Sequence, residues 1–286
     1  MRALLDPKVD FVFKKIFGSE KHPNILISFL NAVIKPIDKI KGVELKETDI
    51  NKDSLEDKFS RLDVKAITSS GEHINIEIQL KNEYNMIKRS LYYWSRLYSE
   101  QLSEGENYSN LSRTICINLL NFKYLKTENF HSSYRLKERI TNEELTDVQE
   151  IHFVEIPKLP KKADITDVLV AWIEFLKDPN SEEVRDIEMS SKEVREAKTE
   201  LIRLSNDDKE RELYNLREKA NKDRTSALEK ALSDGIEQGI EQEKRMSDKK
   251  IKEERLKTAK NLLNMGIDRN KVSEVTKLSI EEVEKI

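Results

Sequence analysis

The chain has 286 residues, of which 37% are hydrophobic and 37% are charged, so a buried core is available but not along the whole length. Lysine and arginine number 51 against 54 aspartates and glutamates, which leaves a net charge of −3. This balance excludes strong non-specific attraction to nucleic acid through overall charge, so a nucleic-acid enzyme of this composition needs a local basic groove.

Cysteine and histidine are scarce in this chain. The single cysteine, Cys116, excludes an intrachain disulfide, and its apolar surroundings favour a small buried hydrophobe. The four histidines are scattered, so they predict no zinc motif. The opening MRALLDPKVD lacks the apolar region of a leader peptide, and no stretch reaches membrane-spanning length. These features predict a cytoplasmic protein without a membrane partner.

The first fifty residues predict two helices and a strand. Asp6-Pro7 suits the start of a helix, and Gly18 suits its end. A second helix begins at Pro23, and its apolar residues recur on one side at Ile25, Leu26, Phe29, Leu30 and Val33. Segment 41–50 predicts the first strand.

Residues 61–80, RLDVKAITSSGEHINIEIQL, predict two strands joined by a tight turn. Gly71 suits the left-handed position that closes a three-residue hairpin loop. This turn sets a register in which Asp63 lies opposite Glu77 on one sheet face, about 5 Å away. The other face carries the alternating apolar residues of the second strand, which are Ile74, Ile76, Ile78 and Leu80.

Two opposed carboxylates repel each other unless a positive group lies between them. A divalent metal ion is the simplest candidate for the group between Asp63 and Glu77. The alternative is a solvated hairpin face, on which Asp, Lys, Glu and Gln are common. The residues alone leave both interpretations open.

Residues 84–102 predict an amphipathic helix. Its apolar side consists of Ile87, Leu91, Trp94, Tyr98 and Leu102. Arg89 and Arg96 lie on the other side with Tyr92, and this basic and aromatic stripe suits contact with the phosphates of a nucleic acid. A solvated polar face is the alternative interpretation.

Three later segments complete an α/β pattern. TICINLLNF (114–122) is too apolar for a half-exposed strand and is predicted to be central in its sheet. A polar stretch follows, and IHFVEIP (151–157) predicts another strand. Residues 165–177 predict a helix around Trp172 and Phe175. The order of elements predicts an α/β sandwich with a mixed sheet flanked by helices.

The composition changes after residue 177. Segment 178–253 is dominated by charged residues and alanine, and predicts a helical linker or self-association region. Gly235 and Gly239 share one side of this helix, where another helix can approach closely. We therefore expect a homo-oligomer, a dimer, formed through the C-terminal helical region.

Residues 254–286 predict a small module that resembles a helix-turn-helix arrangement. Ser279 and Glu282 suit a capping box at the start of its last helix. That helix is acidic, which favours packing or self-association over DNA reading. The chain is thus expected to have three parts, 1–177, 178–253 and 254–286.

The strand pattern resembles the core of the PD-(D/E)XK nuclease superfamily, which has an Asp on one strand and acid-x-Lys on the next. Here the residues are Asp63, Glu77, Ile78 and Gln79, with glutamine in place of the usual lysine. Further segments narrow the resemblance from the superfamily to one family. In chain order these segments are LLDPKVDFVFKKIFGSEKHPNILISFLNAVI, RLDVKA, INIEIQL, RSLYYWSRLYSEQLSEGENYSNL, TICINLLNF, FVEIPKLP and AWIEFLK. Their order is similar to that of the bacterial recombination-promoting nuclease and transposase family.

The resemblance implies a restriction-endonuclease-like α/β core and a DNA endonuclease that uses Mg²⁺, or Mn²⁺ or another divalent ion, in recombination or transposition. It assigns Asp63, Glu77 and the Ile78 carbonyl to the metal, since Mg²⁺ prefers oxygen ligands. Gln79 can orient groups by hydrogen bonds but supplies no charge. The DxxFK segment implies a further acid at Asp10.

Several cations are candidates for contact with DNA, and they are Lys14, Arg61, Lys65, Arg89 and Arg96. An ordinary i,i+4 ion pair is the alternative for Asp10 and Lys14. Lys65 shares the face of Asp63 and is a candidate for the missing lysine charge. The alternative function is a catalytically weak or inactive nucleic-acid-binding regulatory protein of the same fold, which Gln79 and the acidic balance favour.

Overall fold

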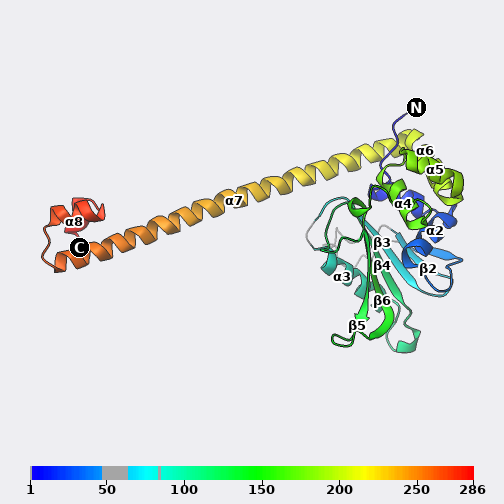
Figure 1. Ribbon diagram of the computed structural model, residues 1–286, viewed down its shortest axis with the longest axis horizontal. Helices are drawn as coiled ribbons and strands as arrows, with labels where there is room; N and C mark the ends of the chain where they lie inside the picture. Colours follow the sequence, from blue (N-terminus) through cyan, green and yellow to red (C-terminus); the bar gives the residue numbers. More distant parts are fainter. Residues whose placement is uncertain (1, 47–63, 83–84) are drawn as a thin grey trace. The chain divides into compact units, whose positions relative to one another are not determined.

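The computed structural model describes residues 2–46, 64–82 and 85–286 (Figure 1). The chain divides into two compact units, Met1–Asn215 and Leu216–Ile286. None of the described helices combines the length and the apolar composition that a membrane-spanning segment needs.

The first unit is built on a mixed sheet. Among the described residues the sheet has six strands in the order β1-β2-β3-β4-β6-β5. The strands are β1 (Val43–Lys46), β2 (Val64–Thr68), β3 (His73–Gln79), β4 (Thr114–Leu120), β5 (His131–Lys137) and β6 (Glu144–Glu155). The β3–β4 and β4–β6 pairs are parallel, and the other pairs are antiparallel. The predicted mixed sheet and the central place of β4 are confirmed, and every residue of β4 is buried.

The hairpin of β2 and β3 has the predicted register. Val64 pairs with Ile76, and Lys65 pairs with Asn75. Gly71 has a φ of +86°, a left-handed conformation that is free of strain only for glycine. Because side chains alternate along a strand, β3 sends its isoleucines into the core and Asn75, Glu77 and Gln79 to the opposite face.

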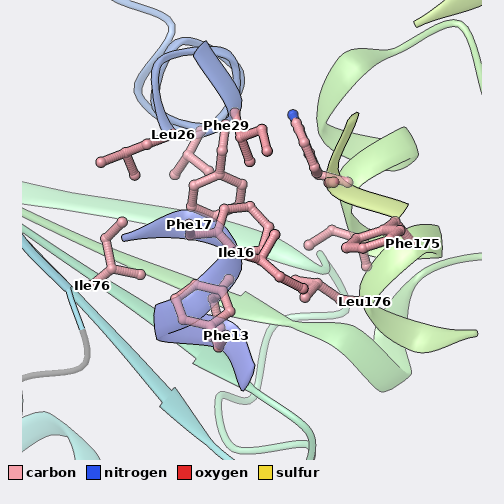
Figure 2. Packing of buried hydrophobic residues seen from close by; sticks show 14 of the residues in the cluster. Phe13, Ile16, Phe17, Leu26, Phe29, Ile76, Phe175 and Leu176 are labelled. Carbon is pink, nitrogen blue, oxygen red and sulfur yellow. The ribbon is translucent and has the colours of Figure 1, made fainter. Parts of the chain in front are cut away.

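The main apolar core lies between the isoleucine face of the sheet and a layer of helices (Figure 2). These helices are α1 (Asp10–Phe17), α2 (Pro23–Ile34), α4 (Val168–Lys177), α5 (Glu182–Ser190) and α6 (Lys192–Asn206). Phe17 stacks on Phe13 with ring centroids 4.4 Å apart, and its ring lies 5.3 Å from those of Phe29 and Trp172. The predicted buried residues of α2 are confirmed, and they are Ile25, Leu26, Phe29, Leu30 and Val33.

Helix α1 begins three residues later than predicted. Asp6 does not cap it, because its carboxylate accepts the N–H of Lys8 at 2.9 Å and forms a turn that leads into the helix. The predicted end at Gly18 is confirmed. A Cβ at that position would lie 2.6 Å from the carbonyl oxygen of Lys14, so only glycine fits.

Helix α3 (Met86–Ser99) packs on the other face of the sheet, but with a different side from the predicted one. Its buried residues are Met86, Ser90, Tyr93 and Leu97. The predicted apolar side was wrong, since Ile87 and Leu91 are 47% and 44% exposed. The side that faces the sheet combines the apolar Met86, Tyr93 and Leu97 with Ser90, which accepts a hydrogen bond from Asn118 of the sheet.

The sequence pattern also missed two parts of the first unit. Strand β5 and the first half of β6 lie in what was expected to be a polar connection before residue 151. The core also continues past residue 177, the expected end of the first part. Helices α5 and α6 contribute buried residues to it, and these are Val184, Ile187, Val194, Ala197, Leu201 and Leu204.

The remaining described elements are short 3₁₀ helices in the first unit and the helices of the C-terminal part of the chain. Two 3₁₀ helices in the first unit are Tyr108–Asn110 and Ile156–Lys158. Helix α7 (Asp208–Asn264) is continuous, and α8 (Arg269–Thr276) and α9 (Ile280–Glu284) follow it. A small apolar cluster joins these last elements through Ala259, Val272, Leu278 and Val283. The predicted capping box of Ser279 and Glu282 is confirmed.

Candidate functional site

Glu77 and Gln79 lie side by side on the α3 face of the central strand β3. They are two residues apart, and the strand alternation gives both the same face. Glu77 is 1% exposed, and Gln79 is partly exposed at the end of the strand. A buried carboxylate is costly unless a positive group or hydrogen-bond donors compensate its charge.

Arg89 of α3 compensates that charge. Its Nη2 lies 3.1 Å from Oε2 of Glu77, and its Nη1 donates to Oε1 of Gln79 at 3.4 Å. The guanidinium also lies over the ring of Tyr93, 5.3 Å from its centroid. Arg89 therefore joins both motif residues of β3 to the helix above them.

Polar side chains fix the position of α3 on the sheet. Asn118 of β4, which pairs with Glu77, donates to the hydroxyl of Ser90 at 2.9 Å and to the carbonyl of His152 at 3.0 Å. The N–H of the Trp94 ring donates to the carbonyl of Thr114 at 2.9 Å. These bonds satisfy buried polar groups and hold the helix in one orientation.

Cys116 also lies on this face, and its chemistry is that of a buried hydrophobe, as predicted. Burial raises the pKa of the Cys116 thiol, and the negative charge of Glu77 raises it further. A thiol with a raised pKa is a poor nucleophile. The site therefore has no activated cysteine at this position.

Lys65 and Arg96, two of the candidate DNA-binding cations, meet at Glu100. The Nζ of Lys65 lies 3.3 Å from one carboxylate oxygen of Glu100, and Nη2 of Arg96 lies 3.4 Å from the other. Arg96 also donates to the hydroxyl of Tyr92 at 3.4 Å. Glu100 thus gathers both charges at the C-terminal end of α3, next to the strand that carries Glu77.

Asp10 and Lys14 lie on α1, one turn apart. The carboxylate of Asp10 accepts the N–H of Phe11 at 2.8 Å, and the side chain of Lys14 is exposed. Helix α1 packs on the core face of the sheet, and its Phe13 belongs to the same buried cluster as Ile76 of β3 (Figure 2). Asp63 and Arg61, the remaining predicted site residues, lie outside the described residues.

A family model for PD-(D/E)XK nuclease family transposases matches residues 7–231 of the chain. The chain belongs to this family. No match was found among curated proteins or among solved structures. The PD-(D/E)XK membership confirms the predicted superfamily and its α/β core, and it supports a nuclease or transposase-like role.

The oxygen donors of this PD-(D/E)XK site suit a hard divalent cation. The carboxylate of Glu77 and the carbonyl of Ile78 are oxygen ligands of the type that such a cation accepts. Within the described part of the chain, no group of three or more His, Cys, Asp or Glu side chains is arranged to hold a metal. A complete metal site in this nuclease family member therefore needs a further acid beside Glu77.

The pairing of Arg89 with the motif was not predicted from the sequence. The sequence pattern places Arg89 on an outward-facing stripe with Arg96, because it predicts that the side of Ile87 and Leu91 faces the sheet. The available signal is charge, because the opposed carboxylates of the predicted hairpin need a positive group nearby unless that face is solvated. The sequence does not show which of the cations of this PD-(D/E)XK domain meets it.

Proposed function

We propose that the protein is a Mg²⁺-dependent DNA endonuclease that hydrolyses phosphodiester bonds, and that it acts in DNA recombination or transposition. The observation that carries this proposal is the placement of Glu77 and Gln79 on one face of the central strand β3, beneath α3. Family membership supports it, because the match includes this strand. Mn²⁺ or another divalent ion with oxygen preference would serve at the same ligands.

We assign the metal to Asp63, Glu77 and the carbonyl of Ile78. The register supports the pairing of the two acids, because Asp63 precedes Val64, Glu77 follows Ile76, and Val64 pairs with Ile76. When bound, Mg²⁺ supplies an activated water and neutralises charge on the scissile phosphate. Gln79 orients that water or a phosphate oxygen through its amide.

The remaining predicted residues are given supporting roles. Asp10 is proposed as an additional acid of the catalytic set, on the N-terminal turn of α1. DNA phosphates are proposed to contact the cations around the site, which are Lys14, Arg61, Lys65, Arg89 and Arg96. Because Lys65 and Arg96 share Glu100, a phosphate that approaches them would replace that carboxylate.

A second function is a nucleic-acid-binding regulatory protein of the same fold with weak or no catalysis. The observation that favours it is the ion pair of Glu77 with Arg89, which occupies the motif carboxylate with a protein cation. Gln79, which has no charge, favours it as well. This protein would bind nucleic acid without metal and leave it uncut.

We also propose that the protein forms a homodimer through α7. Four apolar side chains at successive helical turns of α7 are each more than half exposed, and they are Leu228, Leu232, Ile236 and Ile240. An antiparallel second copy of α7, centred between Leu232 and Ile236, would pair Leu228 with Ile240 and Leu232 with Ile236.

Cleavage of supercoiled plasmid tests the leading proposal. The full-length protein should nick the plasmid with Mg²⁺ and stop with EDTA, and Asp63→Ala and Glu77→Gln should abolish nicking. Glu72→Gln is the matched control, because Glu72 lies at the turn of the same hairpin and pairs with Arg113, outside the proposed site. Unchanged nicking by Asp63→Ala would refute the site. Binding without cleavage across DNA and RNA substrates would favour the regulatory protein instead.

A further inference from the structure

Gln79 occupies the position at which the superfamily pattern has lysine, and its amide carries no charge. A different cation reaches the same place from α3. The guanidinium of Arg89 contacts Gln79 Oε1 at 3.4 Å and Glu77 Oε2 at 3.1 Å. We propose that Arg89 supplies the positive charge that lysine would supply and positions Gln79, an inference that rests on the nuclease function proposed above.

The contact fixes the orientation of the Gln79 amide. A guanidinium has donors and no acceptor, so it bonds the amide through the oxygen. The two N–H groups of Gln79 then point away from Arg89. They are available to a water or to a phosphate oxygen at the end of β3. Without Arg89 the amide could turn over and present its oxygen to the phosphate, which repels it.

The position of Arg89 is fixed by its surroundings. The guanidinium lies over Tyr93, a residue of the next helical turn whose ring is buried. Ser90, the neighbour of Arg89, accepts the hydrogen bond from Asn118 of the central strand. A charge held in place before the substrate arrives costs no reorganisation during the reaction, which is how preorganised donors stabilise a transition state.

The position also leaves the charge accessible to a substrate. The side chain of Arg89 is 26% exposed, whereas that of Glu77 is 2% exposed. The guanidinium thus joins a buried carboxylate on one side to solvent on the other. An arginine presents several donors in a fixed plane, so it can keep its bond to Glu77 and still meet a phosphate oxygen.

Thermal unfolding in EDTA tests the contact without reference to activity. Arg89→Met should lower the Tm because it leaves the carboxylate of Glu77 buried without its cation. Adding Glu77→Gln should recover part of that loss. Arg96→Met is the matched control on the same helix, and its effect should add to that of Glu77→Gln. Additive behaviour of Arg89→Met with Glu77→Gln would overturn the inference, whatever the activity.

Steady-state cleavage with Mg²⁺ tests the role in the reaction. Arg89→Met should lower kcat by roughly 100-fold or more, with little change in KM, as expected for a lost preorganised donor. Arg89→Lys should keep part of the rate because it keeps the charge. Gln79→Lys, added to Arg89→Met, should restore cleavage because it returns a cation to the motif.

Three results separate the possible failures. If Arg89→Met keeps a kcat within about threefold of the wild type, Arg89 is only structural and the inference is wrong. If Arg89→Met loses activity and Gln79→Lys restores none, the charge replacement is wrong. If the folded wild-type protein cuts no nucleic acid with Mg²⁺ or Mn²⁺, the proposed function fails and this inference falls with it.

Discussion

Val64 of β2 lies directly opposite Ile76 of β3, and both side chains are buried in the main core. A slip of one residue would turn the buried face of either strand to the other side of the sheet. The core therefore fixes this register. The same register places Glu77 on the face away from the core, where α3 covers it.

Divalent metal binding should depend on Glu77. Titration of the protein with Mn²⁺, followed by calorimetry, should give a saturable site in the wild type. Glu77→Gln should weaken it by at least about 10- to 100-fold, since even residues behind metal ligands have effects of that size. Glu72→Gln is a suitable control, because Glu72 lies at the hairpin turn and pairs with Arg113 at 2.8 Å. Equal affinity in Glu77→Gln and the wild type would remove Glu77 from the metal site.

The core under the sheet should be sensitive to truncation of Phe17. Its ring is fully buried against Phe13, Phe29 and Trp172. Phe17→Ala should lower the free energy of unfolding by about 3–5 kcal/mol, from lost burial and the cavity left behind. Urea unfolding measures this change. Tyr108→Ala, at an 82% exposed side chain, should stay close to the wild type. A similar effect of both variants would mean that the Phe17 cluster is not the centre of the core.

The hairpin, α2 and β4 could be predicted because local pattern and burial agree there. In the hairpin, strict alternation and a glycine at the turn specify one register. The orientation of α3 could not be predicted, since Ser90 faces the sheet to meet Asn118, and no count of apolar residues shows this. Strand β5 was missed because most of its residues are exposed at the sheet edge.

The contribution of α5 and α6 to the core was missed for a different reason. Their composition is highly charged, and only a narrow stripe that includes Val194, Leu201 and Leu204 is buried. The charge around this stripe resembles that of α7, where the comparable apolar residues are exposed. The sequence pattern alone does not distinguish a helix whose apolar stripe packs on the core from a helix whose apolar stripe is exposed.

The difference between α6 and α7 predicts two outcomes of C-terminal deletion. A chain of residues 1–215 keeps α6, and it keeps Tyr214, whose ring lies 6.4 Å from that of Phe11. It should unfold cooperatively, retain cleavage and lose the dimer. A chain of residues 1–199 loses Leu201 and Leu204, each costing about 2–5 kcal/mol, which is a large part of the stability of a typical domain. It should not fold.

Circular dichroism, light scattering and plasmid nicking measure these outcomes. A folded chain of residues 1–199 would contradict the assignment of α6 to the core. A dimeric chain of residues 1–215 would contradict dimerisation through α7. For the full-length protein, replacing Ile236 and Ile240 with serine should give a monomer while cleavage is kept.

Two histidines meet at the sheet edge formed by β5 and β6, next to the C-terminal end of α2; His152 is buried and His131 is half-buried. Nε2 of His131 lies 2.9 Å from Nδ1 of His152, and Nε2 of His152 lies 2.8 Å from Glu150. The pair lines a cavity of about 370 Å³. Burial lowers the pKa of His131 to about 4, and electrostatic interaction with the nearby His152 and Lys35 lowers it as well.

Stability should therefore fall as the pH is lowered from about 6.5 to about 4. In that range the unfolded chain binds a proton at His131 that the folded chain does not bind, so the free energy of unfolding falls with falling pH. His131→Asn removes this contribution and should reduce the slope in that window, while part of the slope should remain because burial also lowers the pKa of His73. The loss of stability below pH 4.5 should remain in His131→Asn, because hydrogen bonds from His152 and Arg113 outweigh burial and lower the pKa of Glu150 to about 2. Urea unfolding at a series of pH values measures these slopes. An unchanged slope between pH 6.5 and 4 in His131→Asn would show that His131 is not the group that titrates there.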